Sequence, residues 1–373
     1  MEFVRRFFWA TEKSLKAQNP FVDFVLKQWL LILSAIGWVL TSIYTLNFPV
    51  YSKQEIEVLF ILFVLFMSVK GLQDSGLILT IAQKMEKGKT IVAKLVLATF
   101  FLSMLVTNDV AVLVMVPLTL SLNINRKGVV VILEALAANA GSASTPFGNP
   151  QNLFIYWYYQ LHPLVFIETI APFALTFLVV LVLFSLCVKI SNIKQKTVGQ
   201  QIDKKAYVFG GSLLIVLLTI LHILPLVYGV VVVACALVFN RKAFLVDYAL
   251  LVSFFFFFGI AENMKLILAT ELSHSGHVFL FSGLASQVMS NVPAALLFAK
   301  FTTNWQALLW GVNAGGFGSL FGSLANLIVY KIYVMDRGTV DTWRFTAWFL
   351  MAGYTAFVFS IGLYYFIYHV LGF

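Results

Sequence analysis

Two stretches of this 373-residue chain share one pattern: residues 139–156 read NAGSASTPFGNPQNLFIY and residues 313–330 read NAGGFGSLFGSLANLIVY. Aligned without gaps, they agree at Asn139/Asn313, Ala140/Ala314, Gly141/Gly315, Phe147/Phe321, Gly148/Gly322, Asn152/Asn326, Leu153/Leu327 and Tyr156/Tyr330. Biased composition alone would not place the two asparagine pairs, Asn139/Asn313 and Asn152/Asn326, in register. The chain therefore contains an internal repeat, with one copy in each half.

Two further features precede these stretches in the same order in both halves. Residues 107–109 (Thr-Asn-Asp) lie upstream of the first stretch and residues 290–292 (Ser-Asn-Val) upstream of the second, each within apolar sequence. Farther upstream, Asp74 in the first half corresponds to Glu262 in the second, each shortly after a glycine. This shared order extends the repeat over most of the chain.

The composition indicates a membrane protein. Hydrophobic residues make up 61% of the chain and charged residues 11%, whereas about 25% of the residues in soluble domains are charged. Apolar runs near the length of about 20 residues that a spanning helix needs recur from residue 29 to the end of the sequence. The net charge of +9 lies mostly in short loops, which the positive-inside rule explains without a nucleic-acid partner. We therefore predict an all-α polytopic membrane protein in a lipid bilayer.

Positive charge predicts how each copy enters the membrane. Lysines precede residues 107–109, and Arg126 and Lys127 follow them, so both ends of this segment face the cytoplasm. The apolar arms, residues 95–106 and 110–120, are long enough to reach only half-way across. This pattern predicts a re-entrant hairpin. The loop that leads to the second tip, residues 269–277, lacks Lys and Arg, so the second hairpin enters from outside and the repeats have inverted topology.

These signals divide the chain into four parts with a cytoplasmic N-terminus and an outer C-terminus. Residues 1–28 are a cytoplasmic interfacial helix. Residues 29–190 form the first inverted repeat, with its hairpin tip at 107–109 and a broken helix at 139–152. Residues 191–225 are a cytoplasmic loop and linking helix. Residues 226–373 form the second repeat, with its tip at 290–292 and a broken helix at 313–326.

The four interruptions predict the functional site. Lipid cannot hydrogen-bond free backbone groups, so broken helices at membrane depth must line a polar cavity or be buried in protein. In transporters with inverted repeats, such breaks bind ions and substrate. We predict one Na+ site per repeat, at Asn108 with the carbonyls around Gly141 and at Asn291 with those around Gly315. The alternative is that the small residues only allow close helix packing. The predicted ion- or substrate-binding residues are Thr107, Asn108, Asp109, Gly141, Ser142, Ser144, Thr145, Gly148, Asn149, Asn152, Ser290, Asn291, Asn313, Gly315, Gly316, Gly318, Ser319, Gly322, Ser323 and Asn326.

Four carboxylates are candidates for a proton path. Asp109 occupies the position that the apolar Val292 occupies in the second tip. A carboxylate inside a membrane segment is a functional candidate by default. It could instead cap the following helix. Asp74 and Glu262 could line an access path or reach toward the interface from helix ends. Glu134, within the first broken span, is the fourth candidate.

The motifs VTNDVAVLVMVPL, NAGSASTPFGNPQNL, SNVPAALL and GGFGSLFGSLANLI resemble those of the ion transporter superfamily. The resemblance covers nearly the whole chain and is greatest to the branch of arsenite permeases, D-type Na+/H+ antiporters and citrate and dicarboxylate permeases. It implies an elevator-type homodimer, with Thr107, Asn108, Ser290 and Asn291 beside Na+ and substrate. Dicarboxylate carriers of this group have Ser-Asn-Thr at both tips. The departure at Asp109 and Val292 favours the arsenite and antiporter side or another small anion.

We therefore predict a secondary active transporter that moves a small anion or oxyanion together with Na+ or H+, and requires no other cofactor. The alternative is a Na+/H+ antiporter. A membrane-embedded enzyme is less well supported, because the sequence contains neither His-Glu-x-x-His nor Gly-x-Ser-x-Gly and its histidines are scattered. A passive channel is less well supported because paired hairpins suit alternating access.

Overall fold

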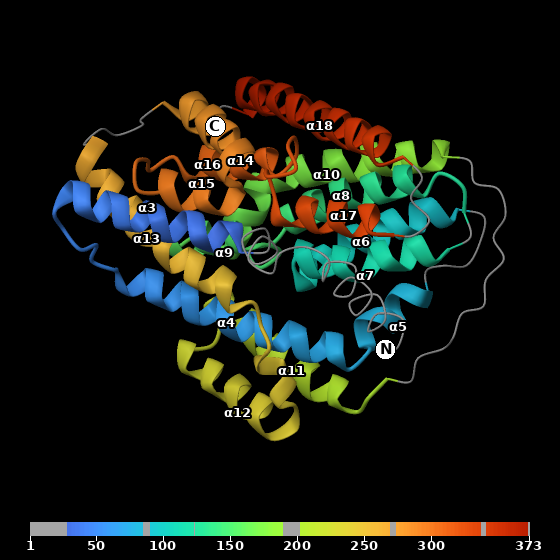
Figure 1. Ribbon diagram of the computed structural model, residues 1–373, viewed down its shortest axis with the longest axis horizontal. Coiled ribbons are helices and arrows are strands. Elements are labelled where there is room, and N and C mark those ends of the chain that lie inside the picture. The colour runs from blue at the N-terminus through green and yellow to red at the C-terminus, as the bar shows by residue number, and fades with distance from the viewer. Residues whose placement is uncertain are drawn as a thin grey trace, which may run out of the picture. The chain divides into compact units, whose positions relative to one another are not determined.

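The computed structural model describes residues 28–84, 90–122, 124–188, 202–268, 274–336 and 341–371. Every regular element within these ranges is a helix (Figure 1), as the composition predicted. Three helical spans among them are long and apolar enough to cross a membrane: Pro163–Cys187, Arg241–Ile267 and Thr342–Tyr368. The second span includes the short 3-10 helix Arg241–Phe244 and most of the α-helix Tyr248–Leu268. The predicted interfacial helix of residues 1–28 lies almost wholly outside the described residues, as does most of the predicted loop after residue 190.

The chain forms two compact units, and the first combines residues 1–51 with residues 247–269. Its described helices, α3 (Trp29–Thr45) and α13 (Tyr248–Leu268), pack against each other. The indole Nε1 of Trp38 donates to the hydroxyl of Tyr51 at 3.0 Å, and Asn263 Nδ2 donates to Thr41 Oγ1 at 3.2 Å. The Asn263–Thr41 bond is part-buried and joins two helices that are about 200 residues apart in sequence.

The second unit combines residues 52–246 with residues 270–373 and contains all the predicted hairpins and broken helices. Its α-helices are α4 (Lys53–Asp74), α5 (Leu77–Lys84), α6 (Ile91–Val106), α7 (Asn108–Ser121), α8 (Lys127–Ala143), α9 (Pro150–Tyr158), α10 (Pro163–Cys187), α11 (Lys205–Ile220), α12 (Gly229–Phe239), α14 (Ser275–Met289), α15 (Asn291–Phe298), α16 (Trp305–Gly315), α17 (Leu324–Val334) and α18 (Thr342–Leu371). Two short 3-10 helices, η1 (Leu226–Tyr228) and η2 (Arg241–Phe244), flank α12.

The apolar stretch of residues 58–82 is interrupted. Helix α4 ends at Asp74, and α5 begins at Leu77. Between them Gly76 has φ +77°, and Ser75 Oγ donates back to the carbonyl of Leu72 at 2.7 Å. Glycine adopts this left-handed conformation without steric cost and commonly ends helices. Hydropathy alone did not reveal this stop, because both sides of it are apolar.

The hairpin arms meet at single residues in both copies. Helices α6 and α7 are separated only by Thr107, and α14 and α15 only by Ser290. In each pair the two arms contact each other. The breaks coincide with the polar triplets from which the sequence predicted the tips. Entry of these hairpins into the membrane from opposite sides stays a prediction.

Two further helix interruptions lie within the asparagine-rich stretches. Helix α8 ends at Ala143 and α9 begins at Pro150, while α16 ends at Gly315 and α17 begins at Leu324. Figure 1 shows α17, from the second copy, beside α7 from the first, and the two helices contact each other. Helix α15 likewise contacts α9. Each hairpin is therefore packed against the broken helix of the other copy.

Candidate functional site

Both hairpin tips have the same backbone geometry. Thr107 has φ 81° and ψ 151°, and Ser290 has φ 74° and ψ 157°. The next amide in each copy donates to a glycine carbonyl of the broken helix: Asn108 N to Gly148 O at 3.1 Å, and Asn291 N to Gly322 O at 3.0 Å. A positive φ with extended ψ is rare outside glycine and persists only when the surroundings hold it. Each tip is thus held at the break of its own copy by a matching bond.

The two receiving glycines are required by close approach of the backbone. A Cβ added to Gly148 would overlap the carbonyl of Ser142, and one added to Gly322 would lie 2.6 Å from the carbonyl oxygens of Gly315 and Phe317. Only glycine lets the chain fold back this tightly. The registered glycines of the repeat therefore maintain the two interruptions.

A buried asparagine satisfies the carbonyls that each break exposes. Asn152 Nδ2 donates to the carbonyls of Ser142, Ala143 and Thr145 at 3.2, 3.0 and 3.2 Å. These groups have lost their helical partners, and lipid could not replace them. The side-chain amide therefore stabilises the open backbone by donating to these carbonyls.

The second copy repeats this arrangement. Asn326 Nδ2 donates to the carbonyls of Gly316 and Ser319, both at 3.0 Å. Both asparagines are at most 3% exposed. The residue pair that identified the repeat in the sequence thus performs the same structural task in both copies.

The same asparagines connect the copies. Asn139 Nδ2 donates to Asn326 Oδ1 at 2.8 Å, and Asn313 Nδ2 donates to Asn152 Oδ1 at 2.7 Å. Asn108 Nδ2 donates to Asn139 Oδ1 at 3.2 Å. We call the buried set formed by Asn108, Asn139, Asn149, Asn152, Asn313 and Asn326 the central amide network. The bonds form two trios, Asn108–Asn139–Asn326 and Asn149–Asn152–Asn313. Ser142 links the trios, because its hydroxyl donates to the Asn139 carbonyl and accepts from Asn149 Nδ2, both at 3.1 Å. Together they join four half-helices and the first hairpin tip.

Helix N-termini lie at this network. Asn149 caps α9 by accepting from the amide of Asn152 at 2.9 Å, and its Nδ2 donates to Asn313 Oδ1 at 3.3 Å. Ser323 caps α17, and its hydroxyl lies 3.4 Å from Asn108 Nδ2, at the start of α7. Such N-termini carry partial positive charge and favour anions.

Asn291, at the start of α15, lies beside Gly316. A Cβ placed on that glycine would be 3.0 Å from Asn291 Nδ2 and 3.6 Å from Asn139 Oδ1. The second tip therefore borders the central amide network at this glycine. The network's neutral donors and acceptors could hold an anion at the helix N-termini or a cation at the amide and carbonyl oxygens.

Other predicted residues serve packing in this structure. A Cβ on Gly141 would overlap the carbonyl of Phe100 on α6, and one on Gly315 would lie 2.5 Å from Ser286 on α14. These contacts favour the close-packing interpretation for both glycines. Thr145 Oγ1 donates to the carbonyl of Met104 at 2.8 Å, which fixes the first break against α6.

Gln287 is a site residue that the sequence analysis missed. Its Nε2 donates to the carbonyl of Gly315 at 2.9 Å, and its Oε1 accepts from the amide of Ser319 at 2.8 Å. Ser319 Oγ donates to the backbone carbonyl of Gln287 at 2.7 Å. The available signal was a lone amide in apolar sequence three residues before the second tip. Gly318, at φ +79°, lies against the same side chain.

The candidate carboxylates lie in different surroundings. Asp109 is in the first turn of α7, where Thr107 holds the N-cap position, so the alternative interpretation of Asp109 as a helix cap is wrong. Asp74 pairs with Lys70 at 3.3 Å on α4, as expected for charge near a helix end. Glu262 lies on α13 in the first unit. Glu134 is fully buried on α8.

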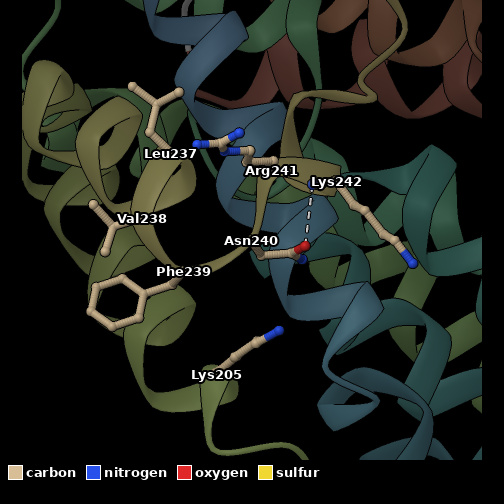
Figure 2. A pocket seen from close by; sticks show the side chains of 7 residues that line it. All are labelled: Lys205, Leu237, Val238, Phe239, Asn240, Arg241 and Lys242. Carbon is tan, nitrogen blue, oxygen red and sulfur yellow. Dashed lines mark hydrogen bonds between the residues drawn. The ribbon is translucent and has the colours of Figure 1, made fainter.

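A surface hollow in the second unit lies next to one of these carboxylates, because Asn240 Nδ2 in its lining donates to Asp74 Oδ2 at 3.5 Å. It has a volume of about 730 Å³ and is lined by Lys205, Arg241, Lys242 and residues 237–240 (Figure 2). Within it, the Lys242 amide donates to Asn240 Oδ1 at 3.2 Å. None of the predicted site residues lines this hollow.

The sequence model described as Citrate transporter (CitMHS) matches residues 7–311. The chain belongs to the citrate transporter family. This confirms the predicted superfamily and identifies a membrane transporter. Two relatives of this family member are the Uncharacterized transporter MJ0456 of Methanocaldococcus jannaschii, 33% identical over 331 residues, and the Inner membrane protein YbiR of Escherichia coli, 35% identical over 329 residues. The alignments cover 84% and 79% of this chain, and 91% and 85% of those proteins.

Proposed function

We propose that this member of the citrate transporter family moves a small carboxylate or oxyanion across the inner membrane together with Na+ or H+. The central amide network carries the proposal, because it joins both broken helices and the first tip through neutral groups at buried helix ends. Citrate is the first substrate to test, since it is in the family's description. The tip residues Asp109 and Val292 differ from the dicarboxylate pattern, so arsenite and other small anions belong in the same screen.

The anion would bind where half-helix N-termini meet. Asn108 and Ser323 lie 3.4 Å apart at the starts of α7 and α17. Backbone amides and the helix dipole at such ends stabilise negative charge without a lysine or arginine. Neutral recognition also allows release, because no strong ion pair has to be broken in each cycle.

The coupling cation would bind on the oxygen-rich side of each break. The proposed ligands are Asn108 with the carbonyls after Gly141 in one copy, and Asn291 with the carbonyls after Gly315 in the other. Ser142 and Ala143 already accept bonds from Asn152. Each carbonyl oxygen has a second lone pair for a cation. When no cation is bound, the hydrogen bonds from the asparagine side-chain amides hold these carbonyls in place.

In this proposal the protein is a homodimer, and its two inverted repeats provide alternating access. One domain moves the binding site across the membrane as an elevator. The paired tip-to-glycine bonds and the paired asparagines support two equivalent halves. The positive-inside pattern supports opposite orientations, with the N-terminus in the cytoplasm. The homodimer and the moving domain rest on the superfamily resemblance.

Transport into proteoliposomes tests this function. Labelled citrate, then other carboxylates and arsenite, would be offered with an inward Na+ gradient, an inward H+ gradient or neither. We expect gradient-dependent uptake by the wild type and strong loss in Asn108→Ala and Asn291→Ala, with uptake retained in the exposed-site control Asn47→Ala. Gradient-independent leakage of all anions would refute the secondary-transport proposal.

Na+/H+ antiport is the second candidate, and Asp109 favours it. A carboxylate at the first tip can bind Na+ or a proton, whereas Val292 at the second tip can bind neither. In vesicles without a transportable anion, an antiporter would release or take up protons on addition of Na+ alone. Absence of that response, together with anion-dependent cation uptake, would exclude this candidate.

A further inference from the structure

Glu134 is a buried carboxyl group that the proposed anion and Na+ sites do not use. It lies on α8 seven residues after Lys127, about 10 Å along the helix axis, and five residues before Asn139 of the central amide network. Its exposed fraction is 0%. Glu134 therefore lies between one end of the membrane segment and the proposed transport site.

Among the described residues, the carboxyl group of Glu134 has one hydrogen-bonding partner. Thr119 Oγ1, on α7, donates to Glu134 Oε1 at 2.6 Å, whereas Oε2 is buried and unpartnered. An ionised carboxylate with a bare oxygen in such surroundings is costly, and a neutral carboxylic acid avoids most of that cost. The surroundings thus favour a bound proton in this conformation.

In the described part of the chain, no positively charged side chain pairs with Glu134 to neutralise its carboxylate. Helix α8 packs against α6, α7, α10, α16, α17 and α18, and no ion pair links Glu134 to them. Lys127, on α8 itself, donates to the carbonyl of Leu120. The charged side chains on the packed helices in the described ranges are Lys94, Asp109, Glu168, Lys331 and Arg344. A proton is therefore the available neutralising charge.

The second copy supplies an internal comparison. Counting from Asn139 and Asn313, the position equivalent to Glu134 is Leu308, which is also 0% exposed. Packing of the broken helix thus accepts a leucine at this place. Of these two equivalent positions, only the one in the first copy has a carboxyl group. A structural contact would be needed in both halves, whereas a proton site is needed only once.

We propose that Glu134 carries the proton that accompanies the anion in each transport cycle. The inference rests on the proposed anion transport and specifies its coupling ion. In the present conformation the carboxylic acid holds the proton. When the opposite conformation admits water between α7 and α8, the O–H bond breaks, the proton passes to water on that side, and the carboxylate takes up another proton on return. Thr119 positions the carboxyl group.

The test separates exchange from net accumulation. Glu134→Gln imitates the protonated acid but cannot release a proton. In proteoliposomes that contain unlabelled citrate, or the anion identified by the screen, we expect exchange within about twofold of wild type. Accumulation driven by an inward H+ gradient should fall to the level without a gradient, and the accompanying proton uptake should vanish. Glu168→Gln, which alters an exposed carboxylate on α10, should keep both activities.

Each outcome has a distinct meaning. If the wild type neither exchanges nor accumulates any anion, the proposed function fails. If wild type transports and Glu134→Gln still accumulates anion with the H+ gradient, the proton assignment is overturned while the function stands. The assignment is likewise overturned if folded Glu134→Gln loses exchange and accumulation together. Should that variant not fold, Thr119→Val keeps the carboxyl group and should shift the pH of half-maximal accumulation. An unchanged pH profile would then overturn the inference.

Discussion

Removing the side-chain amide of Asn152 should destabilise the first break by several kcal/mol. The two hydrogens of Nδ2 are shared among three buried carbonyls, and Oδ1 accepts from Asn313 Nδ2 at 2.7 Å. Asn152→Ala therefore loses these four hydrogen bonds and leaves buried groups without partners. At about 1 kcal/mol per bond, with further desolvation penalties for the orphaned groups, we expect a loss of about 3–5 kcal/mol.

The equivalent substitution in the other copy is the matched comparison. Asn326→Ala removes donors to two carbonyls and an acceptor for Asn139 Nδ2, so its cost should be of the same size. Asn47 is exposed, and Asn47→Ala should change stability by no more than about 0.5 kcal/mol. Equilibrium unfolding of the purified protein in detergent measures all three. If Asn152→Ala costs no more than Asn47→Ala, the carbonyl-capping role is refuted.

Three further changes test the rest of the fold. Glycine at Thr107 or Ser290 relieves the positive φ, so each glycine variant should be about 1 kcal/mol more stable than the alanine variant at the same site, measured by denaturation. Lys300→Met breaks the buried ion pair in which Lys300 Nζ lies 2.9 Å from Glu55 Oε1, and should lower the free energy of unfolding by about 3–5 kcal/mol. Adding Glu55→Gln to this variant should restore part of the lost stability. No recovery in the double variant would contradict the pairing. Gly148→Ala forces a Cβ onto a carbonyl and should lower the melting temperature and uptake together, whereas normal uptake would argue against this close approach.

Much of the fold could be predicted from local patterns. Apolar composition requires helices in lipid, because only intrahelical bonds satisfy the backbone there. The polar triplets at 107–109 and 290–292 interrupt apolar runs, and the helices end there. The break between α4 and α5 was missed because its flanks are apolar and the stop depends on one glycine conformation.

The candidate site was only partly predictable. The registered asparagines identified both breaks, and these residues are buried as a connected set. Gln287 escaped notice because a single amide has no repeat partner: the corresponding position in the first copy is Met104. The alternative interpretation of Asp109 as a helix cap is wrong, because the helix begins at Asn108, two residues before the Val110 start that such a cap requires. Helix starts depend on local backbone geometry that a residue preference does not specify.

The sequence by itself determined the membrane class, the internal repeat and the positions at which the helices break, since these depend on composition and on residues close together in the chain. Only the tertiary structure decided that Asn139 donates to Asn326 and Asn313 to Asn152, across 187 and 161 residues. It also decided that Glu134 faces Thr119 with one oxygen unpartnered. The physical reason is that hydrogen bonding and burial depend on which helix faces pack together, and that packing is a property of the whole chain.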